Sequence, residues 1–252
     1  MRQILSLLVL VVLVTLLQVS FTSSYFSDQA VITGNSLSTA NYAVSPSPSP
    51  SPSPTPRVVI NEIMWMGSVS TASASTADEW IELRNMTDRE IDLSNWKVDG
   101  AASDASLLIP SGKAIPANGY FLISNYDRAD SSSALNVDSN WVTKAVRFNN
   151  SYSQNGAVLL KDQEDHLVDQ TPPASTSAWP AGVNNDQKRS MERNDSPGDG
   201  SQVSSWHSCS DPACNDGIYW KTAEGDNYGT PGSANHSAND PTLPGSELFT
   251  QS

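Results

Sequence analysis

Three glutamates, Glu62, Glu79 and Glu82, are the residues of this sequence best suited to acid–base chemistry. Two carboxyl groups held near each other can serve as a general acid and a general base. If the segment around Glu62 pairs with the segment that holds Glu79 and Glu82, these groups and the amide of Asn61 lie on adjacent strands. No nucleophile, histidine base or glycine-rich phosphate loop accompanies them, so we expect them to bond backbone groups or Arg84 at a sheet edge. We therefore predict no catalytic residues and no enzymatic activity.

The segment between residues 195 and 226 holds a second group of acidic side chains, which could bind a metal. Oxygen ligands in loops are the ligands that Ca²⁺ prefers. The spacing fits neither an EF-hand nor a repeat-type calcium motif, so a solvated acidic loop is the favoured interpretation, with calcium as the alternative. No other cofactor is expected. The candidate calcium ligands are Asp195, Asp199, Asp211, Asp216, Glu224 and Asp226.

The overall charge argues against several classes of partner. The sequence has 14 Lys and Arg against 27 Asp and Glu, which gives a net charge of -13. Binding to nucleic acid or to an anionic membrane surface relies on Lys and Arg contacts to phosphate, so we expect neither partner. With 2 Cys and 3 His in 252 residues, a zinc site of four cysteines is impossible, and little is left for another metal centre.

The N-terminal part of the chain predicts export and a spacer. Residues 4–21 are almost uninterrupted apolar sequence, and small residues follow up to Ser24. We expect a signal peptide over residues 1–24, with an uncleaved N-terminal anchor as the alternative. Residues 25–44 would form the mature N-terminal segment, and residues 45–56 alternate Ser or Thr with Pro, which favours an extended linker. Either way, we expect the rest of the chain outside the cytoplasm, secreted or at the cell surface.

Cys209 and Cys214 are the two cysteines of the chain. Outside the cytoplasm a disulfide between them is favoured, with free thiols as the alternative, and the four-residue spacing excludes a CxxC redox centre. Such a disulfide would pin an exposed loop rather than create an activity. Three tryptophans in this part could stack on sugar rings, but we favour a role in covering one end of the folded domain. They are Trp179, Trp206 and Trp220.

Short apolar segments separated by clusters of Gly, Asn, Asp, Ser and Pro follow the linker and predict an all-β fold. In one of them, Ile81 and Leu83 alternate with Trp80, Glu82 and Arg84, as in a strand with two different faces. No window shows helical periodicity over ten or more residues, so we expect a sandwich or barrel. The expected strands are residues 58–65, 79–85, 90–99 with a turn or bulge near 94–95, 120–124, 142–148, 156–162 and 166–170.

Seven short blocks carry a family resemblance: INEIMW, DEWIELRN, IDLSNWKV, IPANGYFLIS, NGAVLLKD, SMERN and GTPGSAN. In this order they resemble a lamin tail domain, which implies an immunoglobulin-like β-sandwich over residues 57–235 and a disordered tail over residues 236–252. Two stretches depart from the family pattern, a polar loop at residues 67–77 and an Asp- and Asn-rich excursion at residues 174–216. The matching positions are Asn61, Glu62, Glu79, Trp80, Glu82, Trp96, Gly119, Gly229, Pro231 and Gly232. Trp80 and Trp96 are expected in the core, and the glycines in turns.

A second, shorter resemblance concerns residues 25–40, which are similar to the mature start of bacterial camelysin-like and biofilm-fibre proteins. The leader, the linker and the absence of a heptad rod favour the exported prokaryotic type of lamin tail protein. We expect a non-enzymatic binding or structural module at the cell surface, which contacts envelope protein or glycan and meets the membrane only through its N-terminal apolar segment. The alternatives are an extracellular metal-dependent hydrolase, since similar bacterial domains accompany nucleases and phosphoesterases, and a subunit of an extracellular fibre.

Overall fold

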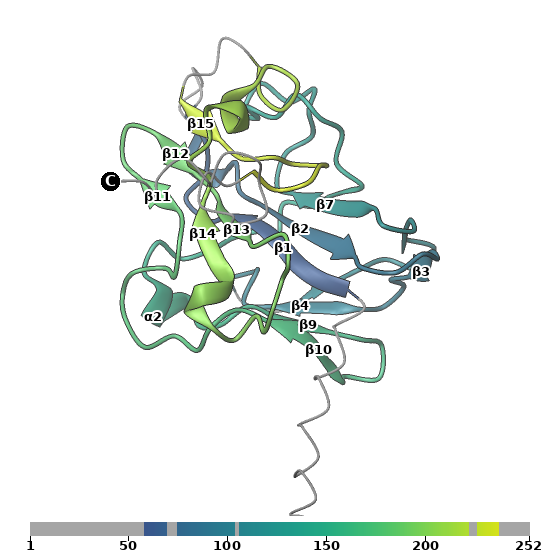
Figure 1. Cartoon of the computed structure of the whole chain (residues 1–252). Coiled ribbons are helices and arrows are strands. Elements are labelled where there is room, and N and C mark those ends of the chain that lie inside the picture. Colours follow the sequence, from purple (N-terminus) through teal and green to yellow (C-terminus); the bar gives the residue numbers. More distant parts are fainter. Residues whose placement is uncertain (1–57, 70–74, 104–105, 222–225, 237–252) are drawn as a thin grey trace, which may run out of the picture. The chain divides into compact units, whose positions relative to one another are not determined.

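The structure is a computed structural model that describes residues 58–69, 75–103, 106–221 and 226–236 (Figure 1). The predicted leader (1–24), mature N-terminal segment (25–44) and linker (45–56) lie outside the described residues, as does the tail beyond His236. The predictions made for these segments stay predictions. Within the described ranges, no helix has the length and the apolar character needed to cross a membrane.

A six-stranded sheet forms the first layer of the fold, with the strand order β14-β13-β1-β2-β7-β8. Neighbouring strands are antiparallel, except that β7 and β8 run parallel. The central strands β1 and β2 are covered on both faces, because all residues of β1 and all but one of β2 are buried. The strands are β1 (Val58–Met64), β2 (Trp80–Asn85), β7 (Tyr120–Ser124), β8 (Trp141–Val142), β13 (Met191–Arg193) and β14 (Trp206–Ser208).

A four-stranded antiparallel sheet forms the second layer, in the order β10-β9-β4-β5, and lies along β1 and β2 (Figure 1). Val98 of β4 and Leu160 of β9 are fully buried in the core, whereas Lys97 and Lys161 of the same strands are partly exposed. This alternation is that of a sheet with one face on a core. The two layers confirm the predicted all-β, immunoglobulin-like sandwich. The strands are β4 (Lys97–Asp99), β5 (Leu107–Leu108), β9 (Leu159–Lys161) and β10 (Leu167–Gln170).

The remaining described elements are short. β11 (Val183–Asn184), β12 (Lys188–Arg189) and β15 (Asn227–Tyr228) form a three-stranded sheet, and β3 (Ile91–Asp92) pairs with β6 (Ala114–Ile115). The helical segments are α2 (Tyr152–Asn155) and the 3₁₀ turns η1 (Ser75–Ala77), η2 (Val203–Ser205) and η3 (Pro212–Asn215). Each of them spans 4 residues or fewer, in agreement with the missing helical periodicity.

A buried ion pair joins the two layers. Asp169 of β10 accepts hydrogen bonds from the backbone N–H of Ile60 at 2.8 Å and from Arg193 Nη1 at 3.0 Å. Arg193 is fully buried, and its guanidinium also donates to the carbonyls of Pro197 and Gly198. Loss of either charged partner would leave the other unpaired in the core, which is strongly unfavourable. The pair therefore fixes β10 against β1 and β13.

Two predictions about the course of the chain are wrong. The expected strand at residues 142–148 stops after Val142, because the chain turns there, and only Val146 and Phe148 beyond it are buried. Val146 and Phe148 are two positions apart, as are residues on one face of a strand, which accounts for the wrong prediction. The expected excursion at residues 174–216 instead supplies β13 and β14 to the six-stranded sheet. Strands of three residues between turns show too little periodicity to be recognised from the sequence.

The turn residues singled out in the sequence do lie in turns. The backbone N–H of Ser94 donates to Asp92 Oδ1 at 2.8 Å, which forms the turn expected near residues 94–95. Gly119 donates its N–H to the carbonyl of Pro116 at 3.0 Å and so closes the turn before β7. Trp96 follows the first of these turns and packs against the core while it remains partly exposed, so its expected core position is met only in part.

Candidate functional site

The polar side chains of β1 and β2 meet on the face of the six-stranded sheet opposite its apolar core. Ile60 lies opposite Leu83, and Glu62 lies opposite Glu82. One residue of β1, Asn61, stands between these pairs without a counterpart on β2 and forms a β-bulge. Without the bulge, Glu62 would share a face with Ile60 and enter the core, because strand side chains alternate. The bulge thus turns Glu62 onto the face that carries Glu82.

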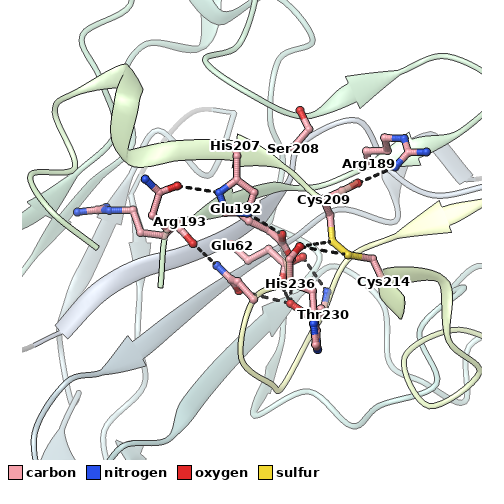
Figure 2. A network of polar contacts seen from close by, with 12 residues as sticks. Glu62, Arg189, Glu192, Arg193, His207, Ser208, Cys209, Cys214, Thr230 and His236 are labelled. Atoms are coloured by element: carbon pink, nitrogen blue, oxygen red, sulfur yellow. Dashed lines mark hydrogen bonds and ion pairs between the residues drawn. A yellow bond between two sulfur atoms is a disulfide. The ribbon is translucent and has the colours of Figure 1, made fainter. Parts of the chain in front are cut away.

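The line of carboxyl groups continues across two more strands (Figure 2). Glu62 lies opposite Glu192 of β13, and Glu192 lies opposite His207 of β14. Opposite residues on antiparallel strands share a face, so Glu82, Glu62, Glu192 and His207 form one row across four strands, which we call the carboxylate row. All three glutamates are 0% exposed.

A segment near the end of the described chain, residues 229–236, covers the row, and we call it the C-terminal strap. Thr230 donates its backbone N–H to Glu62 Oε1 at 2.9 Å. Its hydroxyl lies 3.1 Å from Glu62 Oε2 and 3.0 Å from Glu192 Oε1, so it bridges two strands (Figure 2). A Cβ at Gly229 would lie 2.7 Å from Glu62 Oε1, which explains why a glycine precedes Thr230.

Glu82 and Asn61 hold the second half of the strap. Gly232 donates its N–H to Glu82 Oε2, and Asn61 Nδ2 donates to Glu82 Oε1 at 2.8 Å. Asn235 Nδ2 donates to the carbonyl of Asn61 at 3.0 Å and to that of Arg193 at 2.7 Å. Gly232 has a φ of 81°, which residues with a side chain rarely adopt, so the GTPG turn requires glycine here.

His207 closes the other end of the row. Its Nε2 lies 3.1 Å from Glu192 Oε2, and its Nδ1 lies 2.8 Å from Asn194 Oδ1. Asn194 Nδ2 donates to the carbonyl of Ser204, so its Oδ1 is the accepting end, and the bonding pattern assigns a proton to His207 Nδ1. With this contact, both oxygens of each carboxyl in the row have a partner within the protein.

Burial raises the pKa of every carboxyl in the row. Glu192 raises the pKa of Glu62 further, and Glu62 raises that of Glu82, because like charges repel. Burial raises the pKa of Glu192 to about 8. The hydroxyl of Thr230 carries one proton but has carboxyl oxygens on two sides, so one carboxyl must supply the second proton. The row is thus a set of neutral or shared-proton hydrogen bonds rather than three exposed charges.

The position of the row differs from the expected one. The sequence correctly predicts that Glu62 and Glu82 lie on adjacent strands, but these strands are central in the sheet and not at its edge. Arg84 does not bond to the glutamates and instead pairs with Asp195, at 3.2 Å. A buried row whose oxygens are all engaged offers no carboxyl to a substrate, so its chemistry is that of a structural clamp.

Glu79 is not part of the row. It accepts the backbone N–H of Phe148 at 3.1 Å, and burial raises its pKa to about 8. The third carboxyl of the row is Glu192. The sequence did not identify Glu192, Thr230 or Asn235 as site residues. All three belong to the SMERN and GTPGSAN blocks. Their positions in the family pattern could have marked these three residues as site residues. The local periodicity of the sequence does not distinguish them.

The acidic candidates for calcium are spread over separate turns. Asp199, Asp211 and Asp216 each accept a backbone N–H from two residues further on, at 2.9, 2.8 and 2.9 Å. Asp195 pairs with Arg84, Asp226 is exposed, and Glu224 lies outside the described residues. Within the described ranges these carboxylates do not gather into a group that could share one ion. Calcium stays a prediction.

Cys209 and Cys214 form a disulfide in the structure, with their Cα atoms 6.4 Å apart. Both cysteines are fully buried, whereas Ser210, Pro212 and Ala213 in the loop that they close are exposed, as expected. Each sulfur lies 3.5 Å from the carbonyl oxygen of His236, so the disulfide packs against the end of the strap (Figure 2). Because the sulfurs are bonded to each other, they cannot join Glu192 as metal ligands. Another trio of possible ligands lies in the β9–β10 hairpin: Asp162, Glu164 and His166.

The C-terminal tryptophans cover the core, as the favoured interpretation has it. Trp179, Trp206 and Trp220 are 7%, 6% and 2% exposed, and each indole N–H donates to a backbone carbonyl. Their rings are therefore not available for stacking on a sugar.

The comparison with known proteins agrees with this architecture. Residues 51–173 match the family model of the lamin tail domain. No curated protein matches the chain. The matched residues include β1, β2 and β10 and so hold Glu62, Glu82 and Asp169, whereas Glu192, His207 and the strap follow them. Residues 51–173 are thus similar to the lamin tail domain, and strands from the residues beyond the match complete the main sheet.

Proposed function

We propose that this protein is an exported, non-enzymatic binding or structural module of the cell surface, which contacts an envelope protein or a glycan. The closure of the carboxylate row carries the proposal. Glu62 and Glu82, two of the three residues best suited to acid–base chemistry, hold the strap together with Glu192. Each carboxyl oxygen of these three row glutamates is bonded, and each of the three is 0% exposed. What the fold leaves open is its turns and loops, which on rigid sandwiches make the functional contacts.

Two features of the chain support a place outside the cytoplasm. Residues 4–21 have the length and apolar character of an export segment or anchor, and the Ser-Pro linker would hold the domain at a distance from it. The disulfide between Cys209 and Cys214 is of the kind that persists in oxidising compartments and is rare in the cytosol.

Retention on fractionated cell envelope tests the proposal. The purified full chain is incubated with immobilised envelope fractions, first with Ca²⁺ and then with EDTA, and the bound fraction is measured against concentration. The variant Gly229→Val is the control, because the clash of its side chain with Glu62 should unfold the strap and report adsorption by misfolded protein. We expect saturable retention of the native chain on one fraction and none of the variant. Absence of retention on every fraction would contradict the proposed contact, and loss in EDTA would give calcium a role.

The two alternative functions make different demands on the chain. A metal-dependent hydrolase needs a carboxyl group that both metal and substrate can reach, which the buried Glu62 and Glu82 do not offer. Turnover of a phosphodiester or peptide substrate that Glu62→Gln and Glu82→Gln abolish without unfolding the chain would establish it. A fibre subunit would assemble with rising concentration, which light scattering on the same sample detects.

A further inference from the structure

A cavity of about 420 Å³ lies between the turn after β4 and the segment that leads into α2, away from the carboxylate row. Small-molecule sites have volumes in this range. Amide, hydroxyl and guanidinium groups make up most of its lining, with Phe148 as its aromatic residue. The polar lining residues are Ser103, Arg147, Asn149, Asn150, Gln154 and Asn155.

Aromatic side chains in the protein interior pack against the wall of the cavity and hold it in place. The Trp179 ring lies 5.7 Å from that of Phe148 and 4.7 Å from that of Tyr152, and it stacks on Trp65 at 5.3 Å. The indole N–H of Trp179 also donates to the carbonyl of Asn149 at 2.9 Å. The backbone that carries the lining is therefore held in place before any ligand arrives, which reduces the entropy lost on binding.

Two of the amides are used to build the wall. Asn155 Nδ2 donates to the carbonyl of Gly100 at 3.0 Å, and its Oδ1 accepts the N–H of Asn149 at 2.8 Å. Asn149 in turn accepts the N–H of Ser151 and donates through Nδ2 to Gln154 Oε1 at 3.2 Å. These contacts take the oxygen of the Gln154 amide and leave its NH₂ group.

The nitrogen groups left over are donors, and the Ser103 hydroxyl can both donate and accept. Within the described ranges, the guanidinium of Arg147 forms no ion pair, and the NH₂ groups of Asn150 and Gln154 donate to no protein atom. The neighbouring acid is Glu79, which bonds the N–H of Phe148. Burial raises the pKa of Glu79 to about 8, and the charge of Arg147 lowers this pKa in part, although the two side chains form no ion pair. A ligand for this cavity needs a negative charge and several oxygen acceptors.

We propose that the cavity binds a carboxylate-bearing saccharide, such as a uronic acid unit of an acidic glycan. Arg147 would bind the carboxylate, for which the planar guanidinium can offer two parallel N–H donors. Asn150 and Gln154 would donate to ring or hydroxyl oxygens of the sugar. A peptide is less suited, since peptides are bound along open strand edges or in apolar grooves, and this lining is mostly polar. The inference rests on the proposed function and names the class of glycan.

Calorimetric titration of the full chain tests the site, with a trimer of galacturonic acid as the probe. The matching neutral galactose trimer and inorganic phosphate are titrated alongside it. Arg147→Gln removes the charge, and Arg128→Gln is the matched control, because Arg128 is exposed and lies outside the cavity, 3.8 Å from Asp138. We expect saturable binding of the acidic trimer, weakened roughly 10- to 100-fold by Arg147→Gln and unchanged by Arg128→Gln.

Several results would overturn the inference. They are no binding of the acidic trimer, equal binding of the neutral trimer, equal binding by Arg147→Gln, or competition by phosphate at similar concentration, which would mean a simple anion site. The thermal midpoint of Arg147→Gln should match that of the native chain, so a binding loss is not an unfolding artefact. If the envelope retains Arg147→Gln as well as the native chain, the proposed function stands and this inference fails. If the trimer binds through Arg147 but no envelope fraction retains the chain, this inference stands and the proposed function fails.

Discussion

The substitution Glu192→Gln tests most directly whether protonated carboxyls hold the strap on the sheet. Burial raises the pKa of Glu192 from 4.5 to about 8. Between these values the unfolded chain has released a proton that the folded chain still holds, so the free energy of unfolding falls as the pH rises. One such group accounts for about 1.4 kcal/mol per pH unit, and for on the order of 5 kcal/mol over the whole window as an upper bound.

Urea unfolding followed by tryptophan fluorescence from about pH 5 to about pH 9 measures this dependence. Glutamine keeps the shape of Glu192, and its NH₂ group can donate to His207 Nε2, as the protonated carboxyl does. We expect the variant to match the native chain near pH 5 and to exceed it by a few kcal/mol near pH 9, with a shallower slope between. Carboxylates whose pKa is lowered, such as Asp99 and Asp130, act below about pH 4 and with the opposite sign.

The control is Glu90→Gln, a change at an exposed glutamate outside the row, which should retain the native slope. Native stability that stays level or rises between about pH 5 and about pH 8 would refute the reasoning. So would a Glu192→Gln curve parallel to that of the native chain. Either result would mean that Glu192 is ionised in the fold, and the assignment of its proton to the contact with His207 would be wrong.

Three further predictions concern the other contacts that hold the strap and the layers. Thr230→Val keeps the side-chain shape but removes the bridging hydroxyl, so the unfolding free energy should fall by roughly 1–3 kcal/mol, and an unchanged value would show that the bridge contributes nothing. Arg193→Met leaves Asp169 buried without its cation and should lower the free energy of unfolding in urea by roughly 3–5 kcal/mol. Adding Asp169→Leu should recover part of this loss. If it recovers nothing, the unpaired carboxylate is not the cause of the loss. Reduction of Cys209–Cys214 opens a short loop and should lower stability by roughly 2 kcal/mol, seen as a lower thermal midpoint with dithiothreitol; an equal midpoint would contradict its bracing role.

The parts of the fold that follow from local sequence were predictable. Alternation over residues 79–85 marks β2, and the apolar run at residue 58 marks β1, so their pairing and the neighbouring positions of Glu62 and Glu82 could be expected. The bulge at Asn61 could not be predicted, because it depends on the register in which the side chains on both faces of β1 pack best. In a strand buried on both sides, the period of two gives no preferred face.

The third carboxyl of the row lies beyond the reach of such reasoning. Glu192 pairs with Glu62 across 130 positions of sequence, and β13 is a strand of 3 residues without visible alternation. The buried pair of Asp169 and Arg193 was missed for a different reason, because charged residues are rarely expected in a core. Gly229 shows what a family pattern adds: its lack of a side chain makes sense only once Glu62 is seen beside it.

The polar residues of this domain fall into two physical classes. A buried polar group is costly when unpaired, so the fold gives a partner to each carboxyl oxygen of the row, and the strap, the disulfide and His207 surround it. The cavity beside α2 has the opposite character, because Arg147, Asn150 and Gln154 keep donors that the described chain does not use. Changes in the row should therefore alter stability while binding by the folded fraction stays the same. Changes at Arg147 should alter binding while stability stays the same, and this separation is what distinguishes the clamp of the domain from its recognition surface.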